Sequence, residues 1–183
     1  MLHGGPGTGK SYTLNLIRKG LFEETLGWQQ GVEYQVVTFQ AVMAEALGGD
    51  TIHHALGLNW TGGNDGNSLK RLLELSLATL QWRWLILDEF SMVSAELFAQ
   101  LERRCREIMR DISAAKYGAS DGMVRPFGGL NIILAGDLYQ LPPPRGTFVG
   151  DVPWQLVTGK LAGKTPVAAQ GQFGVEKMGQ CKV

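Results

Sequence analysis

The segment that most constrains this 183-residue chain lies at its start, where glycines surround a proline, a threonine and a Lys-Ser pair. Its eight residues are Gly4-Gly5-Pro6-Gly7-Thr8-Gly9-Lys10-Ser11. Glycines let backbone N–H groups curl around an anion, and the start of a following helix adds partial positive charge. We therefore expect a phosphate-binding loop for a nucleoside triphosphate, in which Lys10 reaches the β- and γ-phosphates and Ser11 places its hydroxyl on Mg²⁺.

The apolar run 84–87 is the expected partner of this loop, because it ends in Asp88 and Glu89. A continuous apolar run is typical of a strand buried on both faces, as in a parallel sheet. Such a strand delivers both acids to the edge of the sheet where the nucleotide binds. We expect Asp88 to hold Mg²⁺ and Glu89 to orient and polarise the attacking water.

A further buried strand is predicted over 131–135, and Gly136-Asp137-Leu138-Tyr139-Gln140 follows it. Ligands of open α/β sheets bind at the carboxyl ends of the strands. Gln140 is therefore a candidate to read the γ-phosphate.

The alternation of elements predicts an α/β fold with a parallel sheet flanked by helices. Strands are expected over 34–39, 84–87 and 131–135, and helices over 11–22, 40–47, 51–58 and 93–112. In a further helix, residues Leu69, Leu72, Leu73, Leu77 and Leu80 follow helical spacing. Only three residues precede Gly4, so the strand that supports the phosphate loop is expected to be almost entirely missing.

Composition narrows the class of protein further. A charged fraction of 19% and a hydrophobic fraction of 44% are those of a chain with a core. The formal net charge of zero excludes a domain that is basic overall, the electrostatic feature expected of many nucleic-acid-binding domains. No run of about 18 apolar residues occurs, so no membrane span is expected. Residues 158–183, with five glycines, four lysines and one acid, are expected to form a disordered or loosely attached tail after a domain over 1–157.

Five segments resemble the Pif-one family of DNA helicases, which belongs with RecD in the 5′-to-3′ branch of helicase superfamily one. Their order and spacing resemble the first RecA-like motor domain, over about residues 4–157. They are Gly-Gly-Pro-Gly-Thr-Gly-Lys-Ser at 4–11, Gly-Gly-Asp-Thr-Ile-His at 48–53, Leu-Asp-Glu-Phe-Ser-Met-Val at 87–93, Pro-Phe-Gly-Gly at 126–129, and Gly-Asp-Leu-Tyr-Gln-Leu-Pro-Pro at 136–143.

The resemblance implies an ATP-dependent helicase that unwinds DNA in repair, recombination or telomere maintenance, with ATP and Mg²⁺ as cofactors and single-stranded DNA as partner. It also implies a nuclear or mitochondrial location. By the same resemblance, Gln140 is the γ-phosphate sensor, and Thr51 and His53 lie in the single-strand-contact motif. A histidine on a short helix is equally well explained as a packed core residue.

The chain departs from the family at Phe39-Gln40-Ala41, where a Pro-Thr-Gly step is usual. Because the resemblance covers one motor domain, as in a fold truncated at both ends, we expect this chain alone not to unwind DNA. Two alternatives stay open. One is a phosphate-loop ATPase that acts as a switch without moving on DNA, and the other is an inactive fragment that binds nucleotide or a partner.

Overall fold

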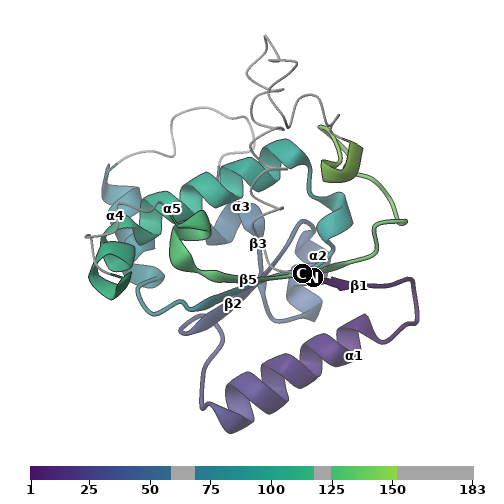
Figure 1. Ribbon diagram of the computed structural model, residues 1–183, viewed down its shortest axis with the longest axis horizontal. Helices are drawn as coiled ribbons and strands as arrows, with labels where there is room; N and C mark the ends of the chain where they lie inside the picture. Colours follow the sequence, from purple (N-terminus) through teal and green to yellow (C-terminus); the bar gives the residue numbers. More distant parts are fainter. Residues whose placement is uncertain (59–68, 118–124, 152–183) are drawn as a thin grey trace.

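A parallel sheet forms the centre of the computed structural model, which describes residues 1–58, 69–117 and 125–151 (Figure 1). Five strands lie in the order β1-β5-β4-β2-β3. Their bounds are Leu2–His3 (β1), Tyr34–Thr38 (β2), Asp50–Thr51 (β3), Trp84–Leu87 (β4) and Asn131–Gly136 (β5). The expected α/β fold is confirmed, and the three strands predicted from apolar runs are β2, β4 and β5.

Helices cover both faces of the sheet (Figure 1). The first helix lies on one face, and α3, α4 and α5 lie on the other. The helical bounds are Lys10–Asn15 (α1), its π-helical continuation Leu16–Thr25 (η1), Ala41–Ala46 (α2), Ile52–Ala55 (α3), Leu69–Ala78 (α4) and Ala95–Tyr117 (α5). Short 3-10 turns span Phe90–Met92 (η3), Pro126–Gly129 (η5) and Val149–Asp151 (η6).

Successive residues of the central strands face opposite layers, as the pleat of a strand requires. Within β4, Leu85 and Leu87 belong to the core beneath α3, α4 and α5, whereas Ile86 belongs to the core beneath the first helix. Both faces of β4 are therefore buried. This explains why its sequence is continuously apolar rather than alternating.

The strand before the phosphate loop is short but formed. Leu2 pairs with Ala135 and His3 pairs with Gly136, both in parallel register with β5. The expectation of an almost missing strand is thus right about its length. Those two residues nevertheless attach the start of the loop to the central sheet.

The leucine pattern of α4 predicts its packing face only in part. Leu72 and Leu75 pack against the core, whereas Leu73, Leu77 and Leu80 are exposed. The helix meets the core along one narrow face, so residues at neighbouring helical positions point away from it. The tail expected over 158–183 lies outside the described residues. Among the described residues, no helix is both long and apolar enough to cross a membrane.

Candidate functional site

The carboxyl ends of the parallel strands meet at one edge of the sheet, and the candidate residues follow them. Across the sheet, the phosphate loop follows β1, Asp137 follows β5, Asp88 follows β4, and Thr51 ends β3. The loop and the segments after β5 and β4 are therefore neighbours. Thr51 and His53 lie at the far end of the same edge, with β2 between them and Asp88.

The loop 4–9 has a shape that depends on its glycines. A Cβ atom on Gly4 would lie 2.6 Å from the Thr8 hydroxyl, closer than van der Waals contact allows. Gly9 has a φ of 90° and is the N-cap of α1, a conformation that side chains disfavour. The Thr8 hydroxyl donates to the Gly5 carbonyl at 2.8 Å. The predicted phosphate loop is thus folded back on itself at the start of a helix, where anions bind.

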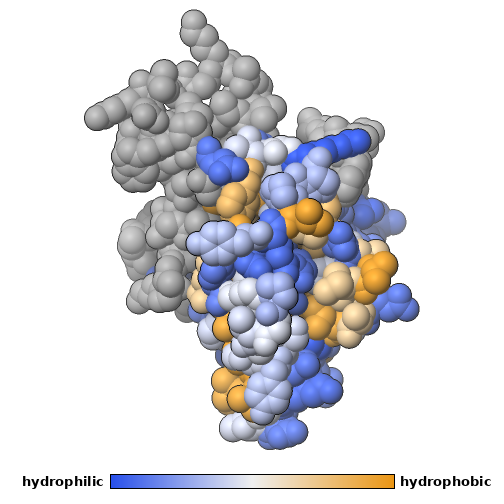
Figure 2. Space-filling view, turned by 90° about the vertical axis from the view of Figure 1, so that its right-hand side faces the viewer, coloured by the Kyte–Doolittle hydropathy of each residue, from blue (hydrophilic) through white to orange (hydrophobic). Residues whose placement is uncertain are grey.

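Figure 2 views the molecule from the side on which the chain passes from β1 to α1. Hydrophilic and intermediate colours surround several separate apolar areas in this view. Ser11, on the first turn of α1, is exposed. The described surface here therefore offers polar groups to a ligand.

Lys10 is half-buried beside this loop. Its ammonium group donates to the Gly4 carbonyl and, at 2.9 Å, to the Gly5 carbonyl. Burial raises the pKa of both Asp88 and Glu89, and the charge of Lys10 opposes this rise. The lysine, the loop and the two acids thus share one electrostatic environment.

Asp88 is a buried carboxyl group at the end of β4. Burial raises its pKa, while the hydrogen bond from the Glu89 backbone and the charges of Lys10 and Arg18 act in the opposite direction. Arg18 is itself buried in η1. Its guanidinium donates to Gln30 Oε1 and to the Leu47 carbonyl, both at 2.6 Å.

Glu89 lies in a left-handed backbone conformation, with φ 52° and ψ 43°. Its pKa is raised by burial, then by the negative charges of Asp88 and Asp137, and is lowered by Lys10. A carboxyl group that binds its proton more tightly than usual and faces other acids is a common feature of catalytic sites.

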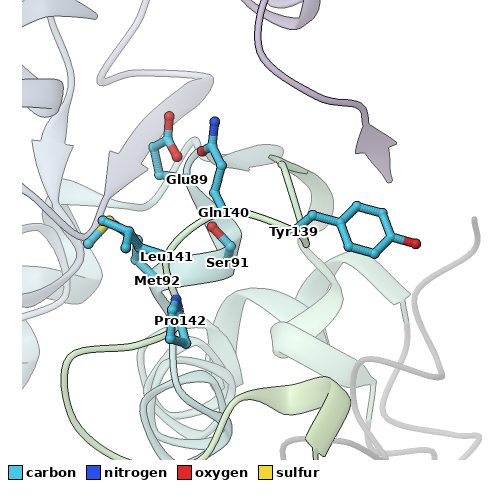
Figure 3. A pocket seen from close by; sticks show the side chains of 7 residues that line it. All are labelled: Glu89, Ser91, Met92, Tyr139, Gln140, Leu141 and Pro142. Atoms are coloured by element: carbon cyan, nitrogen blue, oxygen red, sulfur yellow. The ribbon is translucent and has the colours of Figure 1, made fainter.

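A cavity of about 480 Å³ opens between the segments that follow β4 and β5. Figure 3 shows the side chains of Glu89 and Gln140 extending to the same side, while Tyr139 points away from them. The Ser91 hydroxyl is buried and, among the described residues, has no hydrogen-bond partner. The lining residues are Glu89, Ser91, Met92, Tyr139, Gln140, Leu141 and Pro142.

At the far end of the edge, Thr51 and His53 have structural contacts. The Thr51 hydroxyl accepts a hydrogen bond of 3.2 Å from the His54 backbone and so caps α3. The His53 ring is half-buried, lies edge-on to Phe39 at 6.3 Å, and has its pKa lowered by burial.

Sequence reasoning gave no role to Asp137 or Ser91. Asp137 is buried at the end of β5, next to the loop that follows β1. Asp137 could have been identified from the sequence, since it follows an apolar run, and the same pattern indicated Asp88. The position of Ser91 in the cavity depends on how the chain turns after β4, which no local pattern shows.

A five-stranded parallel sheet flanked by helices, with a glycine-rich loop after its first strand and acids after a central strand, defines an α/β domain of the RecA-like class. The chain belongs to the PIF1-like helicase family, whose sequence profile matches residues 1–147.

The chain is similar to curated members of this family. It is 33% identical over 143 residues to the ATP-dependent DNA helicase PIF1 of Candida albicans, covering 76% of this chain and 14% of that protein. It is 31% identical over 148 residues to the ATP-dependent DNA helicase RRM3 of Saccharomyces cerevisiae, covering 76% of this chain and 18% of the relative. The chain therefore spans less than a fifth of these two relatives.

Solved structures agree with this relationship. The crystal structure of Pif1 helicase from Candida albicans matches with a TM-score of 0.62 at 29% identity, over 80% of this chain and 31% of that one. A Bacteroides Pif1 helicase in complex with ADP-AlF3 and single-stranded DNA matches with a TM-score of 0.55 at 25% identity, over 88% of this chain and 32% of that one.

Proposed function

We propose that this chain is the ATP-binding motor part of a 5′-to-3′ DNA helicase that couples ATP hydrolysis to unwinding in repair, recombination or telomere maintenance. Its relatives in Candida albicans and Saccharomyces cerevisiae are ATP-dependent DNA helicases, which supports the activity. A protein with this role works where DNA is, in the nucleus or the mitochondrion. Since the chain spans only part of its relatives, the activity proposed belongs to a protein that contains this part together with a second motor domain.

One observation carries the nucleotide assignment. Lys10 contacts the carbonyls of its own loop after β1, and the two acids follow β4 at the same edge of the sheet. A lysine in a glycine-rich loop near two strand-end acids is the arrangement that surrounds a metal-bound triphosphate in phosphate-loop enzymes. The residue types also suit Mg²⁺, which takes one or two protein oxygen ligands and completes its shell with phosphate and water.

In this proposal, the backbone of Gly4, Gly5, Pro6, Gly7, Thr8 and Gly9 would surround the phosphates, and Ser11 and Asp88 would hold Mg²⁺. Held there, the ion would supply positive charge beside the phosphates. Lys10 leaves the Gly5 carbonyl and donates to the phosphates. Its ammonium group then exchanges one set of oxygen acceptors for another, so little desolvation is added.

Glu89 and Gln140 act at the γ-phosphate end. The raised pKa of Glu89 suits a group that accepts a proton from the attacking water. Gln140 is exposed and shares the cavity with Glu89, so its amide is free to turn toward the γ-phosphate. Gln140 would then contact the nucleotide only when the γ-phosphate is present.

Titration of a fluorescent ATP analogue with Mg²⁺ tests the nucleotide site. Lys10→Ala is expected to weaken binding about tenfold or more, since a hydrogen bond to a charged group contributes about 1.5–3 kcal/mol. Lys19→Ala is the matched control, because Lys19 is an exposed cation in the continuation of the same helix. Equal weak binding by the wild type and Lys10→Ala would identify an inactive fragment. ATP turnover indifferent to single-stranded DNA would instead identify a switch ATPase.

We also propose that single-stranded DNA passes over the β3 end of the sheet edge, at Thr51 and His53. The structures of Bacteroides Pif1 in complex with single-stranded DNA support this partner. Thr51 contributes by capping α3, which fixes the direction of the His53 ring beside Phe39.

Fluorescence anisotropy with a labelled oligonucleotide tests this second site. His53→Ala is expected to weaken binding about fivefold or more, because a base contact contributes about 1–3 kcal/mol. Lys19→Ala again serves as the control. Unchanged DNA affinity in His53→Ala, together with a lower unfolding temperature, would show that His53 is only a packing residue.

A further inference from the structure

Asp137 makes both hydrogen bonds that shape the turn carrying Gln140. Its Oδ1 atom accepts from the Tyr139 backbone at 3.0 Å, and its carbonyl accepts from the Gln140 backbone at 3.1 Å. The side chain is buried, so water does not compete for these contacts. The direction in which Gln140 leaves the sheet is therefore set by Asp137.

The same carboxylate also faces the segment at the phosphate loop. A Cβ atom on Gly5 would lie 3.9 Å from Asp137 Oδ2, in ordinary contact. The His3 Nε2 atom lies 3.9 Å from Oδ1, and the His3 ring meets the Tyr139 ring edge-on at 5.7 Å. These residues are adjacent because β1 pairs with β5 and places His3 opposite Gly136.

A third contact connects this turn to the acids after β4. A Cβ atom on Gly136 would lie 2.9 Å from the Phe90 backbone nitrogen, so the end of β5 and the chain after Glu89 are packed without space between them. Close packing of this kind transmits small displacements rather than absorbing them.

We propose that Asp137 is a positioning residue that couples the phosphate loop to the Gln140 turn, with His3 and Tyr139 completing the contact. This inference rests on the proposed nucleotide site, but it concerns a residue outside the glycine-rich loop and outside the proposed Mg²⁺ ligands. Phosphate entering the loop moves Gly5 and His3 against the Asp137 carboxylate. Because both hydrogen bonds of the turn end on Asp137, the turn moves with it, and Gln140 is brought to the γ-phosphate.

Three variants separate the parts of this coupling. Asp137→Asn keeps an oxygen that accepts from the Tyr139 backbone while it removes the charge. Asp137→Ala removes the acceptor as well, and His3→Ala removes the contact on the β1 side. His54→Ala is the matched control, since His54 is also an exposed histidine paired with an aspartate, Asp50, but lies at the β3 end of the sheet edge.

Hydrogen exchange of the segment 137–142 in the nucleotide-free chain is the first measurement. Asp137→Ala is expected to speed exchange of the Tyr139 amide about tenfold, the effect of losing one hydrogen bond. Asp137→Asn stays within about twofold of the wild type because the acceptor remains. His3→Ala speeds exchange about threefold, as expected for a weak partly exposed pair, and His54→Ala changes nothing. If either His3→Ala or Asp137→Ala exchanged at the same rate as the wild type, the proposed coupling would be overturned.

The second measurement adds the ATP analogue and Mg²⁺. Binding is expected to slow exchange of the turn in the wild type and in Asp137→Asn. In Asp137→Ala the slowing is lost, because the turn no longer moves with the loop when nucleotide binds. Slowing that persists in Asp137→Ala would overturn the proposal. Absence of any nucleotide binding by the wild type overturns the nucleotide site instead, and the nucleotide-free exchange of His3→Ala then decides the coupling alone.

Discussion

The backbone N–H of Glu89 donates a hydrogen bond of 2.9 Å to Oδ1 of Asp88, the residue before it. This bond accompanies the left-handed conformation of Glu89, at φ 52°. A non-glycine residue there costs about 1–2 kcal/mol. Asp88 thus helps to hold the candidate catalytic acid in a conformation that its own backbone disfavours, and such strain is characteristic of functional sites.

Substitutions of Glu89 should therefore change the free energy of unfolding and ATP hydrolysis independently of each other. Glu89→Gly is expected to raise the free energy of unfolding by about 1 kcal/mol, because glycine adopts this conformation without penalty. Glu89→Gln keeps the strained backbone and should be less stable than Glu89→Gly. Both variants should lose the ATP hydrolysis that we propose for a protein containing this part and a second motor domain. Chemical denaturation and a phosphate-release assay measure the two quantities, and a Glu89→Gly protein less stable than Glu89→Gln would contradict the argument.

The Ser91 hydroxyl leads to a second prediction. It is buried without a partner among the described residues, and an unsatisfied polar group costs about 1–3 kcal/mol. Ser91→Ala should then leave the free energy of unfolding unchanged or raise it. Ser94→Ala is the control, because the Ser94 hydroxyl accepts from the Leu97 backbone at 3.1 Å just before α5. Loss of that cap should cost about 1 kcal/mol, and a similar loss in Ser91→Ala would show that Ser91 has a partner in solution.

Gly128 allows a steric prediction. It has a φ of 63°, and an added Cβ would lie 2.5 Å from Met109 Cβ and 2.8 Å from the Cys105 carbonyl. The turn η5 packs against α5 at this point and leads into β5. Gly128→Ala should destabilise the protein by the backbone penalty plus about 1–3 kcal/mol of overlap.

Gly27→Ala isolates the backbone penalty. Gly27 has a similar φ of 67°, and an added Cβ would meet nothing within 4 Å. It should cost only about 1–2 kcal/mol. Equal denaturation midpoints for the two variants would mean that α5 and η5 separate easily.

Tyr34 gives a prediction about pH. Burial and the hydrogen bond to Glu23 raise the pKa of its hydroxyl to about 12, above the usual value of about 10. The folded state therefore holds this proton more tightly than the unfolded state. The resulting stability is complete below pH 10 and is lost as the pH rises from 10 to 12.

Tyr34→Phe should not lose this stability between pH 10 and pH 12. Denaturation at several pH values measures the effect as the difference in the free energy of unfolding between the wild type and Tyr34→Phe. The raised pKa of the buried Cys105 thiol contributes equally to both proteins and cancels. A difference that stays constant across this range would contradict the assignment.

Several features could be predicted because their signals are local in the chain. The run 84–87 is apolar since both faces of β4 are buried, and its sequence alone indicated a strand. The loop 4–11 was recognisable since its glycines are needed for its own backbone shape. The α4 leucines were misleading in part, because spacing alone does not show how wide the packed face is. Leu73 and Leu77 fit the pattern, yet they are exposed.

The sequence by itself determined which segments we propose as the site: the glycine-rich loop, Asp88 with Glu89, and Gln140. Each is a short motif whose residue types have a direct physical requirement. Only the tertiary structure decided which of these segments are neighbours. The order β1-β5-β4-β2-β3 inserts β5 between the loop and Asp88. It therefore places Asp137 against Gly5 and His3, and leaves Thr51 and His53 on the far side of β2. Strand order arises from packing between distant parts of the chain, so no local pattern could show it.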